Sequence, residues 1–357
     1  MENGKLYKKE LGILEKKKRL RKRKIYDENI TDLASNDYLG LAENKEILDK
    51  AYIHAKKYKS HGAKASQLVN GYHPAHKLLE ERLKTLNNFE DALILGSGFL
   101  ANMALFELGR KGDVFYVDEE YHASGIVGSK LTNAEVIFFK HNDFEDLKLK
   151  SKNYKNYKRV FVAVEGVYSM AGDKVKKEIT DYAQEIGTLI IDEAHSVGVL
   201  GENLMGITDE YNLNPSKTVK MGTLGKALGS YGAYILANRE IIEFLINKAK
   251  SLIYTTALSP IDALLAYYAL EKIQNELENF KEKIQKRRLI LNSDSLIKIV
   301  PAHNNETLLQ KQQELLKNSI LIGAIRAPTV KSPIYRIIGR VNIEIDIIRR
   351  TIDYLKG

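Results

Sequence analysis

The chain has 357 residues, of which 44% are hydrophobic and 28% charged, and it contains no cysteine. This length suffices for a large core divided into two or three domains or subdomains. The lack of cysteine excludes disulfides, thiolate metal sites and a cysteine nucleophile, and it fits a reducing compartment. No stretch approaches the length of a membrane span, and the first residues lack the apolar segment of a secretory signal. We therefore expect a cytoplasmic protein without a membrane partner.

The formal net charge is +9, and much of the excess lies in the run KKKRLRKRK, residues 16–24. Such a run could suit nucleic acid or acidic lipid. No aromatic residue interleaves the charges and no nucleic-acid motif follows, so the pattern favours a solvated arm that is helical over residues 1–25. One arginine of this arm could instead hold an anionic substrate. We expect no nucleic-acid partner.

In chain order, turns after residue 25 lead to expected helices over residues 45–58 and 74–86. The sequence then predicts strands alternating with helices near residues 99–108, 125–130 and 177–186, with the strands at residues 92–95, 114–117, 136–139, 159–164, 188–191, 218–220 and 234–236. Continuous apolar strands that alternate with helices indicate a mostly parallel sheet covered on both faces.

The last third of the chain predicts a different organisation. A long helical region over residues 241–288 is broken at Ser259-Pro260, and residues 296–357 carry shorter strands and two helices. We expect three parts: an N-terminal arm (residues 1–44), a large sheet domain (residues 45–257) and a smaller α+β C-terminal domain (residues 258–357).

A lone lysine, Lys226, lies in the small-residue stretch TVKMGTLGKALGSYGA, residues 218–233. Glycines allow tight turns and the close approach of backbone to a flat, charged group. A glycine-rich turn with a solvated lysine explains the stretch equally well. Ala227 stands where a nucleotide-binding P-loop needs Ser or Thr, which argues against nucleotide hydrolysis.

A second glycine motif, Gly96-Ser-Gly98-Phe-Leu-Ala101, follows a strand and opens a helix, and Asp118 lies 20 residues after Gly98. This is a fair dinucleotide fingerprint. The motif by itself indicates only a phosphate-binding site, because backbone N–H groups at a helix N-terminus suit any phosphorylated cofactor. An oxidoreductase that binds a dinucleotide is therefore one alternative, although it leaves Lys226 unexplained.

Polar residues follow several other strands: His122, Glu165 with Ser169, and Asp192 with Glu193 and His195. Each has an ordinary interpretation as a loop or capping residue. A metal site is conceivable at Asp192, but no second His or carboxylate cluster has matching spacing, and we expect none. Because the carboxyl ends of parallel strands meet at one sheet edge, these residues are expected to converge with Gly98 and Lys226.

This set of groups fits pyridoxal 5'-phosphate (PLP). It consists of a phosphate-binding site, a carboxylate, a hydroxyl, an imidazole and a lone lysine. A lysine forms a Schiff base with its aldehyde. A carboxylate keeps the pyridine nitrogen protonated, which makes the ring an electron sink.

Motifs in a fixed order extend over nearly the whole chain: SNDYLGL (35–41), VNGYHPAHKLLEERL (69–83), GSGFLAN (96–102), YHAS (121–124), EGVYSMAGD (165–173), DEAHSVGVLGE (192–202), GTLGKALGSYGA (222–233), IYTTALSP (253–260) and AIRAPTV (324–330). On these motifs the chain resembles the α-oxoamine synthases. The resemblance implies a fold-type I α/β transferase with a seven-stranded, mostly parallel sheet. It also implies a homodimer whose active site lies at the subunit interface.

The resemblance implies a role for each matching position. Lys226 would be the Schiff-base lysine, Asp192 the partner of the pyridine nitrogen, and His122 the residue stacked on the ring, with His195 completing the catalytic set. The remaining cofactor contacts would come from Gly98, Phe99, Ser169, Thr223 and, across the dimer, Thr255 and Thr256. Substrate contacts would come from Arg21, Asn36, His122, Thr329 and Arg336.

The resemblance also implies the reaction, in which an amino acid condenses with an acyl thioester and CO2 is lost. The biotin-pathway member, which uses L-alanine and pimeloyl-CoA or pimeloyl-carrier protein, is the one expected. Glycine C-acetyltransferase, or another member of the family, is the alternative. The chain departs from the family's pattern at Glu193, at Ser196-Val197, in SHGAKASQL (60–68) and in RIIGR (336–340).

Overall fold

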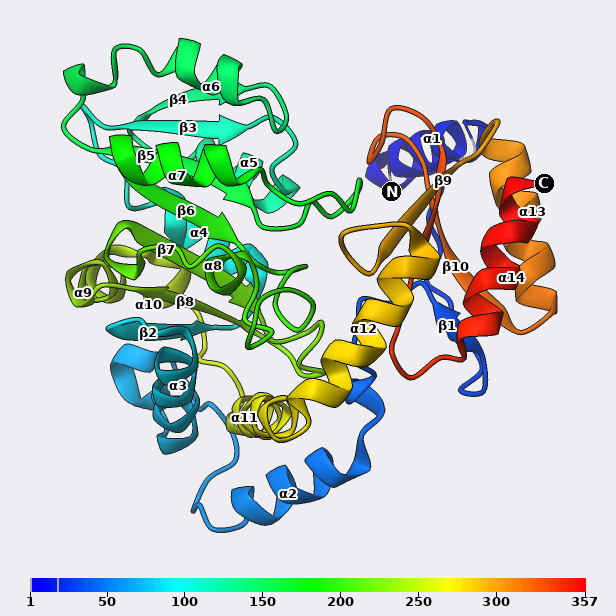
Figure 1. The fold of residues 1–357 in the computed structure, drawn as a ribbon, viewed down its shortest axis with the longest axis horizontal. Helices are drawn as coiled ribbons and strands as arrows, with labels where there is room; N and C mark the ends of the chain where they lie inside the picture. Colours follow the sequence, from blue (N-terminus) through cyan, green and yellow to red (C-terminus); the bar gives the residue numbers. More distant parts are fainter. Residues whose placement is uncertain (1, 18) are drawn as a thin grey trace. The chain divides into compact units, whose positions relative to one another are not determined.

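A computed structural model describes residues 2–17 and 19–357 and is drawn in Figure 1. The chain forms two units. The larger comprises Asn36–Leu296 and Arg340–Asn342, and the smaller comprises the residues up to Ser35 with Ile297–Gly339 and Ile343–Gly357. These units differ from the expected parts at residues 36–44, 258–296 and 340–342, which group with the larger unit.

The larger unit is built on a seven-stranded sheet of order β2-β8-β7-β6-β5-β3-β4. Only β8 runs against the other strands, since it pairs antiparallel with both β2 and β7 while the remaining pairs are parallel. The strands are β2 (Asp91–Leu95), β3 (Val114–Asp118), β4 (Glu135–Phe139), β5 (Val160–Glu165), β6 (Thr188–Asp192), β7 (Thr218–Thr223) and β8 (Ala233–Ala237). The predicted mostly parallel, seven-stranded sheet is confirmed.

Helices cover both faces of this sheet, with α7 in front of it and α4 behind it in Figure 1. All residues of β3 and β5 are buried, as continuous apolar strands between two helical layers require. The helices are α2 (Lys45–Ala55), α3 (Pro74–Asn87), α4 (Gly98–Phe106), α5 (Ala123–Ser129), α6 (Phe144–Lys150), α7 (Lys177–Ile186), α8 (Ile207–Glu210), α9 (Arg239–Lys248), α10 (Lys250–Ile253), α11 (Pro260–Asn275) and α12 (Leu277–Leu291).

The predicted helical region 241–288 is therefore four helices. The expected break is present, because Pro260 occupies the first turn of α11, where its missing N–H is tolerated. Further interruptions occur at Ala249 and Glu276.

The smaller unit has a four-stranded sheet of order β1-β10-β11-β9. Its elements are α1 (Glu2–Lys16), β1 (Thr31–Leu33), β9 (Ile297–Pro301), α13 (Asn305–Lys317), β10 (Ile320–Ile325), β11 (Ile334–Ile338) and α14 (Ile345–Lys356). The three residues of β1 pair in parallel with Ile320–Ile322 of β10. Part of the expected N-terminal arm is thus a strand of the smaller sheet.

The prediction of a helix over residues 1–25 is wrong beyond its first two-thirds. Helix α1 ends at Lys16, and residues 19–26 are neither helix nor strand. On a helix, the basic run would place like charges three and four residues apart side by side, where they repel, and this disfavours a helix there. Among the described residues no helix is both long and apolar enough to cross a membrane.

Candidate active site

The candidate site lies at the carboxyl edge of the parallel strands in the larger unit. Strands β3, β5, β6 and β7 end at Asp118, Glu165, Asp192 and Thr223. Glu165 stands opposite Asp192 in the β5–β6 register, and Asp192 stands opposite Met221 of β7. The strand ends therefore meet as the parallel pattern predicted, at the edge where α/β folds bind ligands.

Lys226 follows β7 and is part of a chain of three polar side chains. Its Nζ lies 2.8 Å from His195 Nε2, and His195 Nδ1 lies 2.6 Å from the hydroxyl of Tyr38. Tyr38 and His195 are buried, and Lys226 is half-buried. A neutral imidazole has one donor and one acceptor nitrogen, and the Tyr38 hydroxyl can donate or accept. The tautomer of His195 therefore decides whether its Nε2 donates to Lys226 or accepts from it.

The glycines around Lys226 have conformational and packing roles of their own. Gly229 has a φ of +58°, and a Cβ placed on it would lie 2.4 Å from the backbone nitrogen of Ala42. A Cβ on Gly222 would lie 2.3 Å from the hydroxyl of Tyr234. The small-residue stretch is thus needed to fold this loop, whatever group approaches Lys226.

Asp192 is a buried carboxylate with two hydrogen-bond donors. Asn102 Nδ2 donates to its Oδ2 at 2.9 Å, and the backbone N–H of Ala194 donates to its Oδ1 at 2.9 Å. Asn102 also accepts from the Tyr121 hydroxyl at 2.8 Å and contacts Ser124 Oγ at 2.9 Å. These donors hold the Asp192 side chain in one orientation, and each carboxylate oxygen keeps a further lone pair that can accept from a protonated ring nitrogen.

Glu165 is a buried acid beside Asp192. Its Oε2 accepts the backbone N–H of Ser169 at 3.1 Å, and no described residue hydrogen-bonds its Oε1. Burial, and secondarily the charge of Asp192, raise the pKa of Glu165 well above its ordinary value. The neutral, protonated form of Glu165 is therefore favoured over its carboxylate more strongly than in an exposed glutamate.

His122 caps the N-terminus of α5. Its Nδ1 accepts the backbone N–H of Ser124 at 3.2 Å and lies 2.7 Å from the Ser124 hydroxyl. Desolvation lowers the pKa of His122 more than Asp192 raises it, and Lys226 lowers it further. The ring is therefore neutral, and part of it is exposed, as stacking on a flat ligand requires.

The first turn of α4 has backbone N–H groups that can donate hydrogen bonds to a ligand. Ser97 Oγ accepts the N–H of Leu100 at 3.3 Å. Among the described residues no acceptor hydrogen-bonds the N–H groups of Gly98 and Phe99, and a Cβ on Gly98 would meet nothing within 4 Å. This helix terminus is open to an anion such as a phosphate. At the end of β7, Thr223 Oγ1 accepts the N–H of Gly225 at 3.0 Å.

Ser169, Asn36, Thr255 and Thr256 also lie in the larger unit. Ser169 is buried, Thr255 Oγ1 donates to the carbonyl of Ser251 at 2.6 Å, and Thr256 is exposed. The roles expected for them stay predictions.

Three predicted substrate residues lie in the smaller unit: Arg21, Thr329 and Arg336. Arg21 Nη2 donates to Thr329 Oγ1 at 3.3 Å, and both residues line a cavity of about 530 Å³. Arg336 lies in β11 and is buried. The fold therefore brings together two of the predicted substrate residues that are 308 positions apart in the chain.

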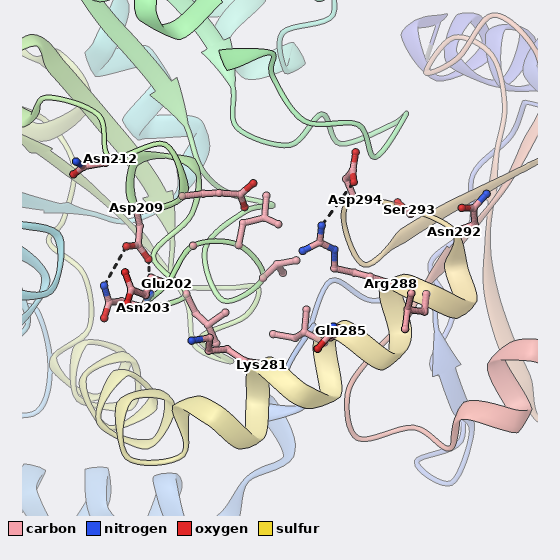
Figure 2. A pocket seen from close by; sticks show the side chains of 17 residues that line it. Glu202, Asn203, Asp209, Asn212, Lys281, Gln285, Arg288, Asn292, Ser293 and Asp294 are labelled. Carbon is pink, nitrogen blue, oxygen red and sulfur yellow. Dashed lines mark hydrogen bonds and ion pairs between the residues drawn. The ribbon is translucent and has the colours of Figure 1, made fainter. Parts of the chain in front are cut away.

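A cavity of about 1210 Å³ lies elsewhere in the larger unit (Figure 2). It is bordered by α12 and residues 199–212, and its described lining includes none of the predicted site residues. Its charges are largely paired, since Glu210 contacts Lys174 at 2.5 Å and Arg288 contacts Asp294 at 3.7 Å. The described residues contain no group of three or more His, Cys, Asp or Glu that could hold a metal ion.

Two residues that contact the site directly had no role predicted from the sequence. Asn102 hydrogen-bonds Asp192, and Tyr38 hydrogen-bonds His195. One signal was present for Asn102, a buried polar residue in the otherwise apolar helix GFLANMALF, one turn after Gly98. No comparable local signal marks Tyr38, since its partner is 157 residues away.

Comparison with known proteins agrees with this geometry. Residues 28–345 match the family model of aminotransferase class I and II. The chain belongs to the aminotransferase class I and II family. An 8-amino-7-oxononanoate synthase of Helicobacter pylori is 44% identical over 342 residues, which cover 93% of this chain and 92% of the relative. This similarity confirms the predicted membership of the α-oxoamine synthases within the aminotransferase class I and II family.

Solved structures share the fold. An 8-amino-7-oxononanoate synthase from Francisella tularensis has a TM-score of 0.77 and 28% identity, covering 92% of this chain and 98% of that chain. A structure of SPT with PLP has a TM-score of 0.84 and 24% identity, covering 92% and 86% respectively, and at that identity shows the fold alone.

Proposed function

We propose that the protein catalyses the PLP-dependent condensation of L-alanine with a pimeloyl thioester, releasing CO2 and giving 8-amino-7-oxononanoate for biotin synthesis. The similarity to the Helicobacter pylori synthase over almost the full length of both chains supports this reaction. The observation that carries it is the half-buried Lys226 amine, 2.8 Å from the His195 imidazole at the sheet edge that also holds Asp192.

The described residues fit PLP. The open N–H groups of Gly98 and Phe99, with Thr223, would hold the phosphate, and Asp192 would hold the pyridine nitrogen. His122 would stack on the ring, and Ser169 and His195 would contact its phenolic oxygen. Lys226 would bind the cofactor covalently.

When bound, the cofactor supplies an electron sink for the carbanion formed at the amino acid Cα. Asn102 orients Asp192, so the carboxylate that supports this sink is held in place before substrate arrives. Lys226 removes the Cα proton as general base. His195, hydrogen-bonded on its other nitrogen to Tyr38, can then hold or return a proton at Lys226 Nζ.

Substrate recognition would use residues that the family resemblance assigned to it. A buried arginine such as Arg336 can clamp the alanine carboxylate through two parallel hydrogen bonds. Arg21 and Thr329, which already contact each other beside a cavity, would bind the acyl thioester. The thioester carrier is coenzyme A or a carrier protein.

We further propose a cytoplasmic homodimer in which Thr255 and Thr256 contact the phosphate held by the partner subunit. The exposed side chains of Tyr254 (80% exposed) and Val69 (76%) support this arrangement. Their segments are joined by a hydrogen bond from Ala257 N–H to the Ala65 carbonyl, so one apolar surface beside the two threonines is available for burial.

Replacing Lys226 with Ala tests the assignment. We expect Lys226→Ala to lower turnover by at least about 10³-fold, the range of a general base, and to remove the visible absorption of lysine-bound cofactor. Lys111→Ala, at an exposed position, should leave both unchanged. An active Lys226→Ala enzyme would contradict the proposal.

A substrate screen tests the reaction. Purified enzyme is assayed with alanine, glycine and serine against pimeloyl and acetyl thioesters, following CO2 and thiol release. We expect alanine with pimeloyl thioester to give the highest kcat/KM. A preference for glycine with acetyl-CoA would instead assign glycine C-acetyltransferase.

A further inference from the structure

A charged cluster lies next to the candidate site, at the carboxyl ends of β3, β4 and β5. His141 follows β4, and its Nδ1 lies 3.1 Å from Asp118 Oδ1 while its Nε2 lies 3.1 Å from Asp173 Oδ2. Glu120 Oε2 is 3.9 Å from the same Nε2. The ring stands edge-on to Tyr168, with centroids 4.4 Å apart. One imidazole therefore bridges carboxylates from two different loops.

Both ring nitrogens face carboxylate oxygens, so both must donate, and only the imidazolium does so. Burial alone would lower the pKa of His141, but its hydrogen bonds to Asp118 and Asp173 outweigh burial and raise the pKa to about 10. His141 is thus a cation throughout the neutral range.

The two bridged carboxylates belong to the loops that carry candidate cofactor residues. Asp118 is fully buried and orders the β3 loop, since its Oδ1 accepts the N–H of Glu120 at 2.8 Å and its carbonyl accepts that of Tyr121 at 3.0 Å. The next residue along this loop is His122.

Asp173 closes the β5 loop that carries Ser169. Its carbonyl accepts the N–H of Tyr168 at 2.9 Å, and the Tyr168 hydroxyl donates to Asp118 Oδ2 at 2.8 Å. Asn142 adds a neutral bridge, donating through its backbone to Asp118 and through its side chain to Asp173. His141 is the cation that the other members of this network share.

Without that cation the remaining charges repel. Asp118, Asp173 and Glu120 are all acidic, and Glu119 Oε1 accepts the backbone N–H of His141 at 3.4 Å. The nearby Lys174 is already paired with Glu210. Neutralising His141 would therefore leave unbalanced carboxylates at the junction of the two loops, a costly arrangement for the buried Asp118.

We propose that His141 is a positioning residue that holds the loops bearing His122 and Ser169 in the arrangement that receives the cofactor. The inference rests on the proposed function, because it takes those two residues as cofactor contacts. His141 acts through Asp118 and Asp173 and does not itself touch the cofactor.

The first test compares PLP dissociation from holoenzyme, followed by the visible absorption of bound cofactor, for wild type, His141→Gln and the exposed-residue control His303→Gln. We expect His141→Gln to release PLP 10- to 100-fold faster and His303→Gln to match wild type. Because Ser169 is one of the residues held, Ser169→Ala should weaken binding much less in the His141→Gln background than in wild type. Additive effects would overturn the proposal.

The second test uses pH. The stabilisation by His141 is complete below the ordinary histidine pKa of about 6.5 and is lost as pH rises toward the folded-state pKa of about 10. The Tm difference between wild type and His141→Gln should therefore be largest near the lower value and shrink toward the upper one. A difference that stays constant with pH would overturn the proposal.

Asp173→Asn provides a milder variant, because it removes the ion pair of His141 with Asp173 and leaves those with Asp118 and Glu120. It keeps the test decisive where His141→Gln fails to fold. It should release PLP 2- to 10-fold faster. Failure of the wild-type protein to bind PLP would refute the proposed function. Tight binding by wild type, Asp173→Asn and His141→Gln alike would refute this inference alone.

Discussion

At the scale of single residues, Asn102 determines how Asp192 is presented. Asn102 is 1% exposed and lies between the Asp192 carboxylate and the Tyr121 hydroxyl. Its amide donates to one and its carbonyl accepts from the other, so no other residue type of this size satisfies both. The proposed partner of the pyridine nitrogen thus depends on a residue from a different element, α4.

Replacing Asn102 with Ala leaves the Tyr121 hydroxyl and Asp192 Oδ2 buried without these partners. We expect a loss of about 2–4 kcal/mol in the free energy of unfolding, since each buried unsatisfied polar group costs about 1–3 kcal/mol. Urea denaturation followed by circular dichroism measures it. Asn133→Ala, at an exposed loop position, is the matched control and should change stability by less than about 0.5 kcal/mol. Equal stability of the two variants would contradict this account.

At the scale of elements, the loop between β7 and β8 fixes the position of Lys226. The N–H of Gly229 donates to the Lys226 carbonyl at 2.9 Å, and the N–H of Leu224 donates to the Gly232 carbonyl at 2.9 Å. Gly229 and Gly232 both have positive φ, at +58° and +116°. The loop can therefore close on itself only with glycine at these positions.

The glycines of this loop are not equivalent, which gives a matched pair of variants. Gly229→Ala adds a Cβ 2.4 Å from Ala42 N in a left-handed conformation, and we expect it to cost at least about 2 kcal/mol in the free energy of unfolding. Gly225→Ala meets its nearest atom, the Ser230 carbonyl oxygen, at 3.4 Å and should cost less than about 1 kcal/mol. Thermal and urea unfolding of both variants compare them. A Gly225→Ala variant as unstable as Gly229→Ala would contradict this reading of the loop.

At the scale of the whole molecule, the proposed dimer predicts a coupling between assembly and cofactor binding. Tyr254 is 80% exposed and immediately precedes Thr255 and Thr256. A partner subunit that covers Tyr254 would bring both threonines to the second cofactor site. A charge at this position would then be buried without a partner, which is strongly unfavourable.

We therefore expect Tyr254→Asp to shift the protein toward monomer and to weaken PLP binding by at least about tenfold, equivalent to about 1.4 kcal/mol. Light scattering coupled to size-exclusion chromatography measures the mass, and absorbance titration measures the cofactor. Leu149→Asp, at a position 65% exposed on α6, should remain dimeric with unchanged affinity. A monomeric wild type that binds PLP fully would refute the dimeric site.

The amino-acid sequence by itself determined the sheet and the edge at which polar residues that follow the strands were expected. Apolar strands such as β3 and β5 are continuous because they are buried on both faces, so composition alone identifies them. Parallel strands place their carboxyl ends at one edge, and polar residues directly after the strands, Asp192 and Lys226 among them, were therefore expected together. The family's motifs then indicated the roles that we propose for those side chains.

Only the tertiary structure decided which side chains touch. Asn102 and Asp192 are 90 residues apart, and Tyr38 and His195 are 157 apart, so neither contact leaves a periodic signal in the chain. The same holds for β1, three residues whose pairing with β10 makes them a strand. Hydrogen bonds between distant segments form because packing removes water from both partners at once. Local residue patterns do not show which distant partners lose water together, and only three-dimensional packing determines it.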